Sequence, residues 1–175
     1  MKLLKYFYSK YKDLLKYFWL IKAKHTTKNI GLNFYIGGPT SLNSNTTIGD
    51  YCSTNGMKII GNGNVVIGDY FNTGHDLLII SSNHNFKNAA YLPYDDLQEK
   101  KNIEIGRCVW IGERVTIIGS IKIGEGAIIA AGSVLTSDVP PLGIAGGNPA
   151  KVFKYRDSEH YNRLIENKKF NLNNS

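Results

Sequence analysis

Histidines and cysteines are the side chains of this sequence that could act as acid–base groups or nucleophiles near neutral pH. The chain has four histidines and two cysteines. An imidazole with an ordinary pKa of about 6.5 can accept a proton at physiological pH, so each histidine is a candidate general base. A catalytic zinc of the three-histidine type needs three such ligands. His75 and His84 lie centrally, whereas His25 and His160 lie towards the ends, so we expect no metal site.

The cysteines, Cys52 and Cys108, form neither a C-x-x-C pair nor a disulfide framework. We expect small, buried, reduced thiols, as is typical of a reducing compartment.

A six-residue repeat, clearest over residues 105–139, indicates the fold that positions the histidines and cysteines. Its first positions are all aliphatic: Ile105, Ile111, Ile117, Ile123, Ile129 and Leu135. Its fifth positions are all small or aliphatic: Val109, Val115, Ile121, Ala127, Ser133 and Val139. A helix repeats every 3.6 residues and a strand every two, so a period of six fits a short strand followed by a corner. Three such sides close a triangular coil, and the coils stack as parallel strands about 4.8 Å apart. The first and fifth positions should point inward, and glycines at the corners should supply positive φ angles.

The same pattern is less regular in residues 30–84. It predicts coils at 30–47, 48–66 and 67–84, followed by 105–122 and 123–140, with an enlarged corner near Asn62–Asn64. Asn83 should point inward, and His84 should take the last place of the third coil. Residues 85–102 break the pattern, with Pro93 and many charges. We interpret them as a loop extruded from one corner, and such loops are usually functional.

The basic charge is concentrated in an N-terminal arm, residues 1–28. This arm carries eight lysines and one aspartate, whereas the remainder carries 13 basic and 13 acidic residues. An amphipathic helix is predicted from its apolar stripe: Leu3, Leu4, Phe7, Tyr11, Leu14, Leu15 and Phe18. This helix could pack on the β-helix or a neighbouring subunit, or residues 1–22 could lie on an anionic membrane surface. Without a basic body or a recognition motif, no nucleic acid partner is expected.

No run of about 18 apolar residues and no signal peptide is recognised, so we expect a cytoplasmic protein. At the other end, a helix from Ser158 to Lys168 should cap the open stack with Tyr161, Leu164 and Ile165. The predicted domains are the helical arm 1–28, a β-helix domain 29–156 and a C-terminal helix with its tail, 157–175.

A family resemblance rests on residues 109–152, VWIGERVTIIGSIKIGEGAIIAAGSVLTSDVPPLGIAGGNPAKV. This run resembles the C-terminal half of the acetyl-CoA-dependent sugar O-acetyltransferases, such as the galactoside, maltose, nodulation-factor and capsular-polysaccharide enzymes. VWIG and GNPAK are its most specific strings, and the similarity extends over roughly residues 30–156. It implies an all-β, left-handed parallel β-helix and a homotrimer that binds acetyl-CoA between subunits. It also implies acetyl transfer to a sugar hydroxyl.

The resemblance also implies roles for particular residues. His84 matches the catalytic base. The implied cofactor contacts are Trp110, Ala131, Thr136, Lys151 and Lys154, the two lysines standing where many relatives have arginine. Asn85, which directly follows the base, and His75, at a corner of the same coil, are candidates for substrate contact from their positions, and the family pattern does not require His75.

Alternatives remain at this stage. The acceptor could be a sugar amine rather than a hydroxyl. A zinc lyase of the γ-carbonic-anhydrase kind shares the fold, but this chain lacks the histidine spacing. The chain could also be a non-catalytic, membrane-associated trimeric scaffold. The basic arm favours work on sugars or lipid-linked oligosaccharides at the inner membrane face, in surface polysaccharide or glycolipid biosynthesis.

Overall fold

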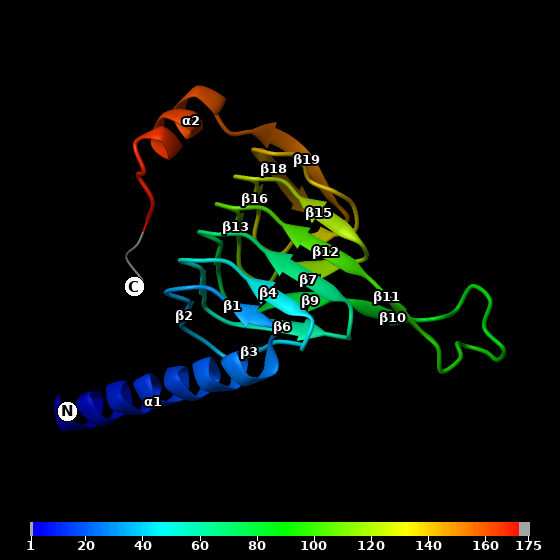
Figure 1. Ribbon diagram of the computed structural model, residues 1–175, viewed down its shortest axis with the longest axis horizontal. Coiled ribbons are helices and arrows are strands. Elements are labelled where there is room, and N and C mark those ends of the chain that lie inside the picture. Colours follow the sequence, from blue (N-terminus) through cyan, green and yellow to red (C-terminus); the bar gives the residue numbers. More distant parts are fainter. Residues whose placement is uncertain (1, 172–175) are drawn as a thin grey trace.

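The chain folds as a left-handed parallel β-helix flanked by two helices (Figure 1). The computed structural model describes residues 2–171; residue 1 of the predicted arm and residues 172–175 of the predicted tail lie outside the described part. The predicted domain boundaries remain predictions.

Three parallel sheets form the sides of the stack, and we call them the first, second and third faces. The first face consists of β1 (Asn29–Ile30), β4 (Thr46–Ile48), β7 (Asn64–Ile67), β12 (Asn102–Ile105) and β15 (Ile121–Ile123). The second face consists of β2 (Tyr35–Ile36), β5 (Ser53–Thr54), β8 (Asn72–Thr73), β13 (Trp110–Ile111), β16 (Ile128–Ile129), β18 (Gly143–Gly147) and the antiparallel β19 (Ala150–Tyr155). The third face consists of β3 (Thr40–Ser41), β6 (Met57–Ile60), β9 (Leu77–Ile80), β14 (Thr116–Ile118) and β17 (Val134–Leu135).

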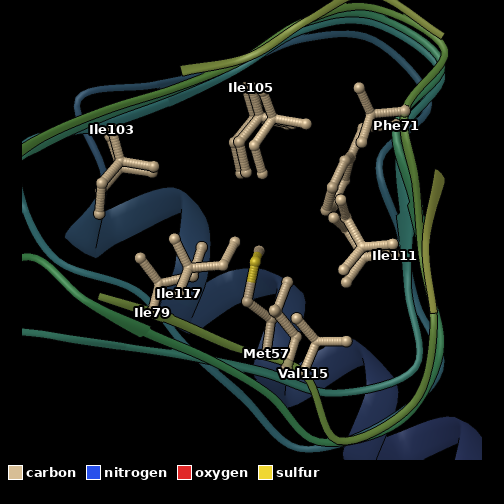
Figure 2. Close-up of a cluster of buried hydrophobic side chains, with 14 of the residues drawn as sticks. Met57, Phe71, Ile79, Ile103, Ile105, Ile111, Val115 and Ile117 are labelled. Carbon is tan, nitrogen blue, oxygen red and sulfur yellow. The ribbon is translucent and has the colours of Figure 1, made fainter. Parts of the chain in front are cut away.

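The interior is a column of hydrophobic side chains, most of them aliphatic and with Phe71 and Met57 among them, that point into the space enclosed by the coils (Figure 2). Every first and fifth position of the hexads in residues 105–139 is buried, as the period predicted. The enlarged corner is confirmed between β6 and β7. It compensates for a short corner at Asn55–Gly56, because Thr40 pairs with Met57 but Thr46 pairs with Val65.

The expected role of the corner glycines is confirmed in part, because Gly56, Gly61, Gly119, Gly126 and Gly132 have positive φ angles. Positive φ angles occur two residues after the hexad glycines, at Asn33, Tyr51, Tyr70, Cys108 and Gly126. Gly106 is needed for a different reason: a Cβ there would lie 2.7 Å from the backbone nitrogen of Glu125 in the next coil. Close stacking of coils therefore selects glycine, while the left-handed corner accepts tyrosine and cysteine at a cost of about 1–2 kcal/mol each.

Helix α1 (Lys2–Thr26) lies across the N-terminal end of the stack and packs against β2 and β3 (Figure 1). Ala23 is buried, and Trp19 and Leu20 pack on the core. Lys16 donates a hydrogen bond from Nζ to the Tyr35 hydroxyl at 3.1 Å. The predicted apolar stripe of this helix is largely exposed, so the contact with the body uses a different face. No helix in the described part of the chain is long and apolar enough to cross a membrane.

Helix α2 (Ser158–Glu166) begins at the N-cap Asp157, which accepts a hydrogen bond from the His160 amide. It does not cap the open end as predicted but flanks the corner between the first and second faces. There the buried Tyr161 donates to Glu125 Oε1 at 3.0 Å. Leu164 and Ile165 face a groove beside the second face. The N-cap Asp157 and the anchored Tyr161 fix the start of the helix at this corner.

An antiparallel hairpin, β10 (Ser82–His84) and β11 (Gln98–Lys100), projects from the corner between the third and first faces (Figure 1). The chain therefore leaves the stack at Ser82, earlier than the predicted residue 85. Asn83 is exposed rather than inward, because it already belongs to the hairpin. His84 likewise lies on the hairpin and not at the end of a coil.

Candidate active site

His84 lies on the first strand of the hairpin, under an aromatic ring. The ring of Tyr94 stacks on its imidazole, with centroids 4.0 Å apart and planes 22° apart. The backbone N–H of His84 donates to Asn83 Oδ1 at 3.0 Å. Nδ1 of His84 is buried and has no hydrogen-bond partner among the residues described. This ring nitrogen is therefore free to form a further hydrogen bond.

The buried carboxylate of Asp95 holds the tip of the hairpin. It accepts hydrogen bonds from the amides of Ala90 and Leu97, at 3.2 and 3.0 Å, and from the side chain of Asn85 at 3.0 Å. Asp95 and Asn85 also form a backbone hydrogen bond. Because Tyr94 directly precedes Asp95, this network sets the place of the ring over His84.

Burial by itself would raise the pKa of Asp95. The hydrogen bonds from the Ala90 and Leu97 amides and from Asn85 outweigh burial and leave the pKa below its ordinary value. Asp95 is therefore ionised at neutral pH and acts as the anchor of the hairpin. The side-chain amide of Asn85, a candidate substrate contact, is turned towards this anchor.

The implied cofactor residues are exposed but spread over three places. Trp110 projects from the second face, in one row with Ile128, Ile144 and Lys154. Lys151 lies further along β19. Ala131 lies at the corner between the second and third faces, and Thr136 at the corner from which the hairpin leaves. The structure thus places Thr136 on the corner from which the hairpin of His84 leaves, two coils further along.

His84 and Trp110 lie on opposite sides of the triangular stack. The hairpin leaves between β9 and β12, at the corner that faces away from the second face (Figure 1). A single chain does not bring the two residues into one site.

His75 is the histidine with a carboxylate partner in the described structure. Its Nδ1 lies 2.9 Å from Glu113 Oε1, and both side chains are more than 60% exposed. It sits at the corner of Ala131, because the Gly132 amide donates to the Glu113 carbonyl and the Arg114 amide to the His75 carbonyl. Sequence reasoning did not find this pair, since it joins positions 38 residues apart.

Neither cysteine is suited to nucleophilic catalysis. Burial raises the pKa of Cys52 to about 12, and burial also raises the pKa of Cys108. Both thiols are therefore protonated at neutral pH, whereas a cysteine nucleophile must be a thiolate.

A groove of about 640 Å³ runs between α2 and the second face. Trp110 and Ile128 line one side, and Tyr161, Leu164 and Phe170 the other. Phe170 stacks on Tyr70 at 3.9 Å between centroids. The groove contains one implied cofactor residue but does not reach His84.

Tyr94 and Asp95 were missed by sequence reasoning. The sequence shows an acidic pair and a tyrosine beside Pro93 in a long irregular loop. This composition indicates a loop, but it does not show which of its residues contact His84.

Comparison with known proteins agrees with this architecture. Residues 102–137 match the family described as bacterial transferase hexapeptide (six repeats). A chloramphenicol acetyltransferase of Klebsiella aerogenes is 36% identical over 121 residues, which are 68% of this chain and 56% of that protein. The chain thus spans little more than half the length of this relative.

Solved structures share the fold over most of the chain. A hexapeptide-repeat acetyltransferase of Vibrio cholerae superposes with a TM-score of 0.68 at 25% identity, covering 77% of each chain. It has also been solved in complex with acetyl coenzyme A. A maltose O-acetyltransferase of Clostridium difficile gives a TM-score of 0.60 at 29% identity, covering 74% of this chain and 67% of that one. The matched repeats show that residues 102–137 are bacterial transferase hexapeptide repeats, and over most of its length the chain is similar to hexapeptide-repeat acetyltransferases.

Proposed function

We propose that this protein transfers an acetyl group from acetyl-CoA to a sugar hydroxyl, with His84 as the general base. The observation that carries the proposal is the position of His84 on a hairpin projecting from the stack, held beneath Tyr94. The acetyltransferase relatives and the acetyl coenzyme A complex of the Vibrio cholerae protein support the donor.

Acetyl transfer requires a general base and a groove that binds both substrates. His84 takes the proton of the acceptor hydroxyl as its oxygen bonds to the thioester carbonyl carbon. The carbon–sulfur bond then breaks, and the proton passes to the departing thiolate. Direct transfer is favoured over a cysteine route because both cysteines are held as protonated thiols.

We infer that the site forms between copies of the chain in a homotrimer. His84 and Trp110 lie on opposite sides of one stack, so a neighbouring copy must supply the second residue. In a closed threefold ring each hairpin meets the second face of the next chain. Trp110, Ala131 and Thr136 would hold the pantetheine arm, and Lys151 and Lys154 the phosphates, with Asn85 and His75 near the acceptor.

Subunit complementation tests the shared site. His84→Ala and Trp110→Ala proteins should each be nearly inactive, and trimers refolded from a mixture of the two should regain part of the activity. Active wild-type monomers, or mixtures that stay inactive although each variant forms trimers, would contradict the inference.

We further propose an acceptor among sugars or lipid-linked oligosaccharides of surface polysaccharide or glycolipid biosynthesis. The enzyme would work in the cytoplasm, with residues 1–22 at the inner membrane face. Acetyl transfer to a panel of sugars and lipid-linked oligosaccharides tests this, with hydroxylamine used to tell an ester from an amide product. A His84→Ala protein that transfers acetyl groups at the wild-type rate would rule out the proposed base, and an amide product would assign a sugar amine as acceptor.

A further inference from the structure

Helix α1 has two apolar faces that point in different directions. The body face consists of Trp19, Leu20 and Ala23, which pack on the end of the stack, and of Lys16, which donates a hydrogen bond to Tyr35. The outward face consists of Leu4, Phe7, Tyr11, Leu14 and Phe18, whose side chains are between 57% and 75% exposed. At 3.6 residues per turn the centres of the two faces lie roughly 150° apart. The outward face therefore points away from the β-helix.

The exposed outward face is a candidate binding surface. Leu4, Phe7, Tyr8 and Tyr11 line one shallow, almost wholly apolar hollow. Contiguous apolar patches on a protein surface mark sites of contact with another protein or with a membrane. The rest of the β-helix leaves this face uncovered, because α1 meets the body only through its other side.

The positive charge of the N-terminal arm favours a membrane over another protein as the partner of the outward face. Residues 1–28 carry eight lysines and one aspartate, whereas the remainder is balanced. Lys5 lines the hollow, and Lys12 Nζ lies 4.7 Å from the ring centroid of Tyr8, which also lines it. Cations thus border the aromatic surface. A second copy of α1 packed on this face would bring the two lysine sets together, whereas an anionic lipid surface neutralises them.

We propose that the outward face of α1 docks on an anionic bilayer, with the N-terminal end of the stack towards the membrane. The apolar side chains enter the boundary between headgroups and acyl chains, and the lysines extend to the lipid phosphates. This inference rests on the proposed membrane contact of residues 1–22 and not on the proposed acetyl transfer. In a trimer with parallel stacks, three α1 helices face the same plane, and their affinities reinforce one another.

Vesicle co-sedimentation of the full chain tests the proposal. Wild-type protein should bind to vesicles of phosphatidylcholine that contain about one third phosphatidylserine. It should bind much less to vesicles of phosphatidylcholine alone. Phe7→Glu should weaken binding to the anionic vesicles by about tenfold or more. Phe153→Glu is the matched control, since Phe153 on β19 is similarly exposed, 66% against 61% for Phe7, but lies at the other end of the stack. It should bind the vesicles as the wild type does.

The oligomeric mass of each protein separates the alternatives. The proposal requires that Phe7→Glu keep the wild-type oligomeric mass and bind acetyl-CoA normally but bind vesicles only weakly. A Phe7→Glu protein that binds vesicles normally overturns it. A change of oligomeric mass without any vesicle binding by the wild type also overturns it and assigns the outward face to a second copy. Because vesicle binding needs no catalysis, loss of acetyl transfer in all proteins would count against the proposed function alone.

Discussion

The stacked coils and the hairpin that leaves them are stabilised by different interactions. In the stack, each inward side chain is covered by equivalent side chains above and below, and the backbone pairs along the three faces. The hairpin has a two-stranded base and a tip organised around one buried carboxylate, Asp95. The stack can therefore tolerate a change at the hairpin tip, whereas the position of His84 depends on a few polar contacts.

The largest effect on stability is expected from Ile117→Ala. Ile117 is fully buried, so loss of its side chain should lower the free energy of unfolding by about 2–5 kcal/mol. Leu92→Ala, at a hairpin residue that is 96% exposed, should change it by no more than about 0.5 kcal/mol. Denaturant unfolding at fixed protein concentration measures both. Equal effects would show that the two regions do not differ as described.

The largest effect on the hairpin alone is expected from Asp95→Asn. The loss of charge weakens the hydrogen bonds from Ala90 and Leu97. Because the tip then no longer fixes the position of His84, acetyl transfer should fall by about tenfold, with a much smaller change in the unfolding midpoint than Ile117→Ala causes. Asp96→Asn, at the exposed neighbouring aspartate, is the control and should retain wild-type activity.

Acid should release the hairpin before the stack. The pKa of Asp95 lies below its ordinary value of 3.8 in the folded chain, so its stabilising contribution is fully present above pH 3.8. It is lost as the pH falls through the lowered value. Faster amide exchange at Ala90 and Leu97 in this range would report the loss. Glu99, whose pKa is also lowered by Lys101, titrates nearby; a step that persists unchanged in Asp95→Asn would therefore belong to another group.

A smaller effect is expected from Tyr94→Ala. Without the stacked ring His84 is less well oriented, which should raise the activation free energy by about 1 kcal/mol and lower kcat about fivefold. Tyr94→Phe keeps the ring and should restore the wild-type rate. If Tyr94→Phe were as slow as Tyr94→Ala, the hydroxyl and not the stacking would be responsible.

The smallest effect is expected from His75→Ala. Its pair with Glu113 is exposed and contributes little to stability. At the rim of the proposed site, the substitution should raise KM for the acceptor by at most about threefold and leave kcat unchanged. A fall in kcat like that of His84→Ala would instead make the His75–Glu113 pair the base. Glu113→Gln, measured beside it, would show whether the carboxylate orients the imidazole.

The interior of the stack could be predicted from the sequence because period six fixes which side chains point inward. Positions such as Ile105 and Val109 obey it throughout, and even the irregular corner at Asn62–Asn64 was visible as a change of phase. The left-handed corners at Tyr51 and Tyr70 could not be predicted. Their φ angles follow from the register of the next coil, and neither residue type favours that conformation.

The hairpin anchor and the orientation of α1 were beyond prediction for a related reason. Asn85 and Asp95 meet across an aperiodic segment, so no repeat marks them as partners. In α1 the apolar residues are numerous enough to support several stripes, and only the shape of the body selects Trp19 and Ala23 for contact. The implied positions of Trp110 and His84 came from family resemblance, which says nothing about the two sides of the stack on which they lie.

The packing of α1 on β2 and β3 also bears on how this fold avoids polymerising. A parallel β-helix is open at its ends, where the first coil has backbone amides and carbonyls that another chain could extend by edge pairing. By lying against the first strands of the second and third faces, α1 obstructs that edge. The same helix that carries the lysines is therefore placed to hinder end-to-end pairing of stacks, without affecting a trimer formed side by side.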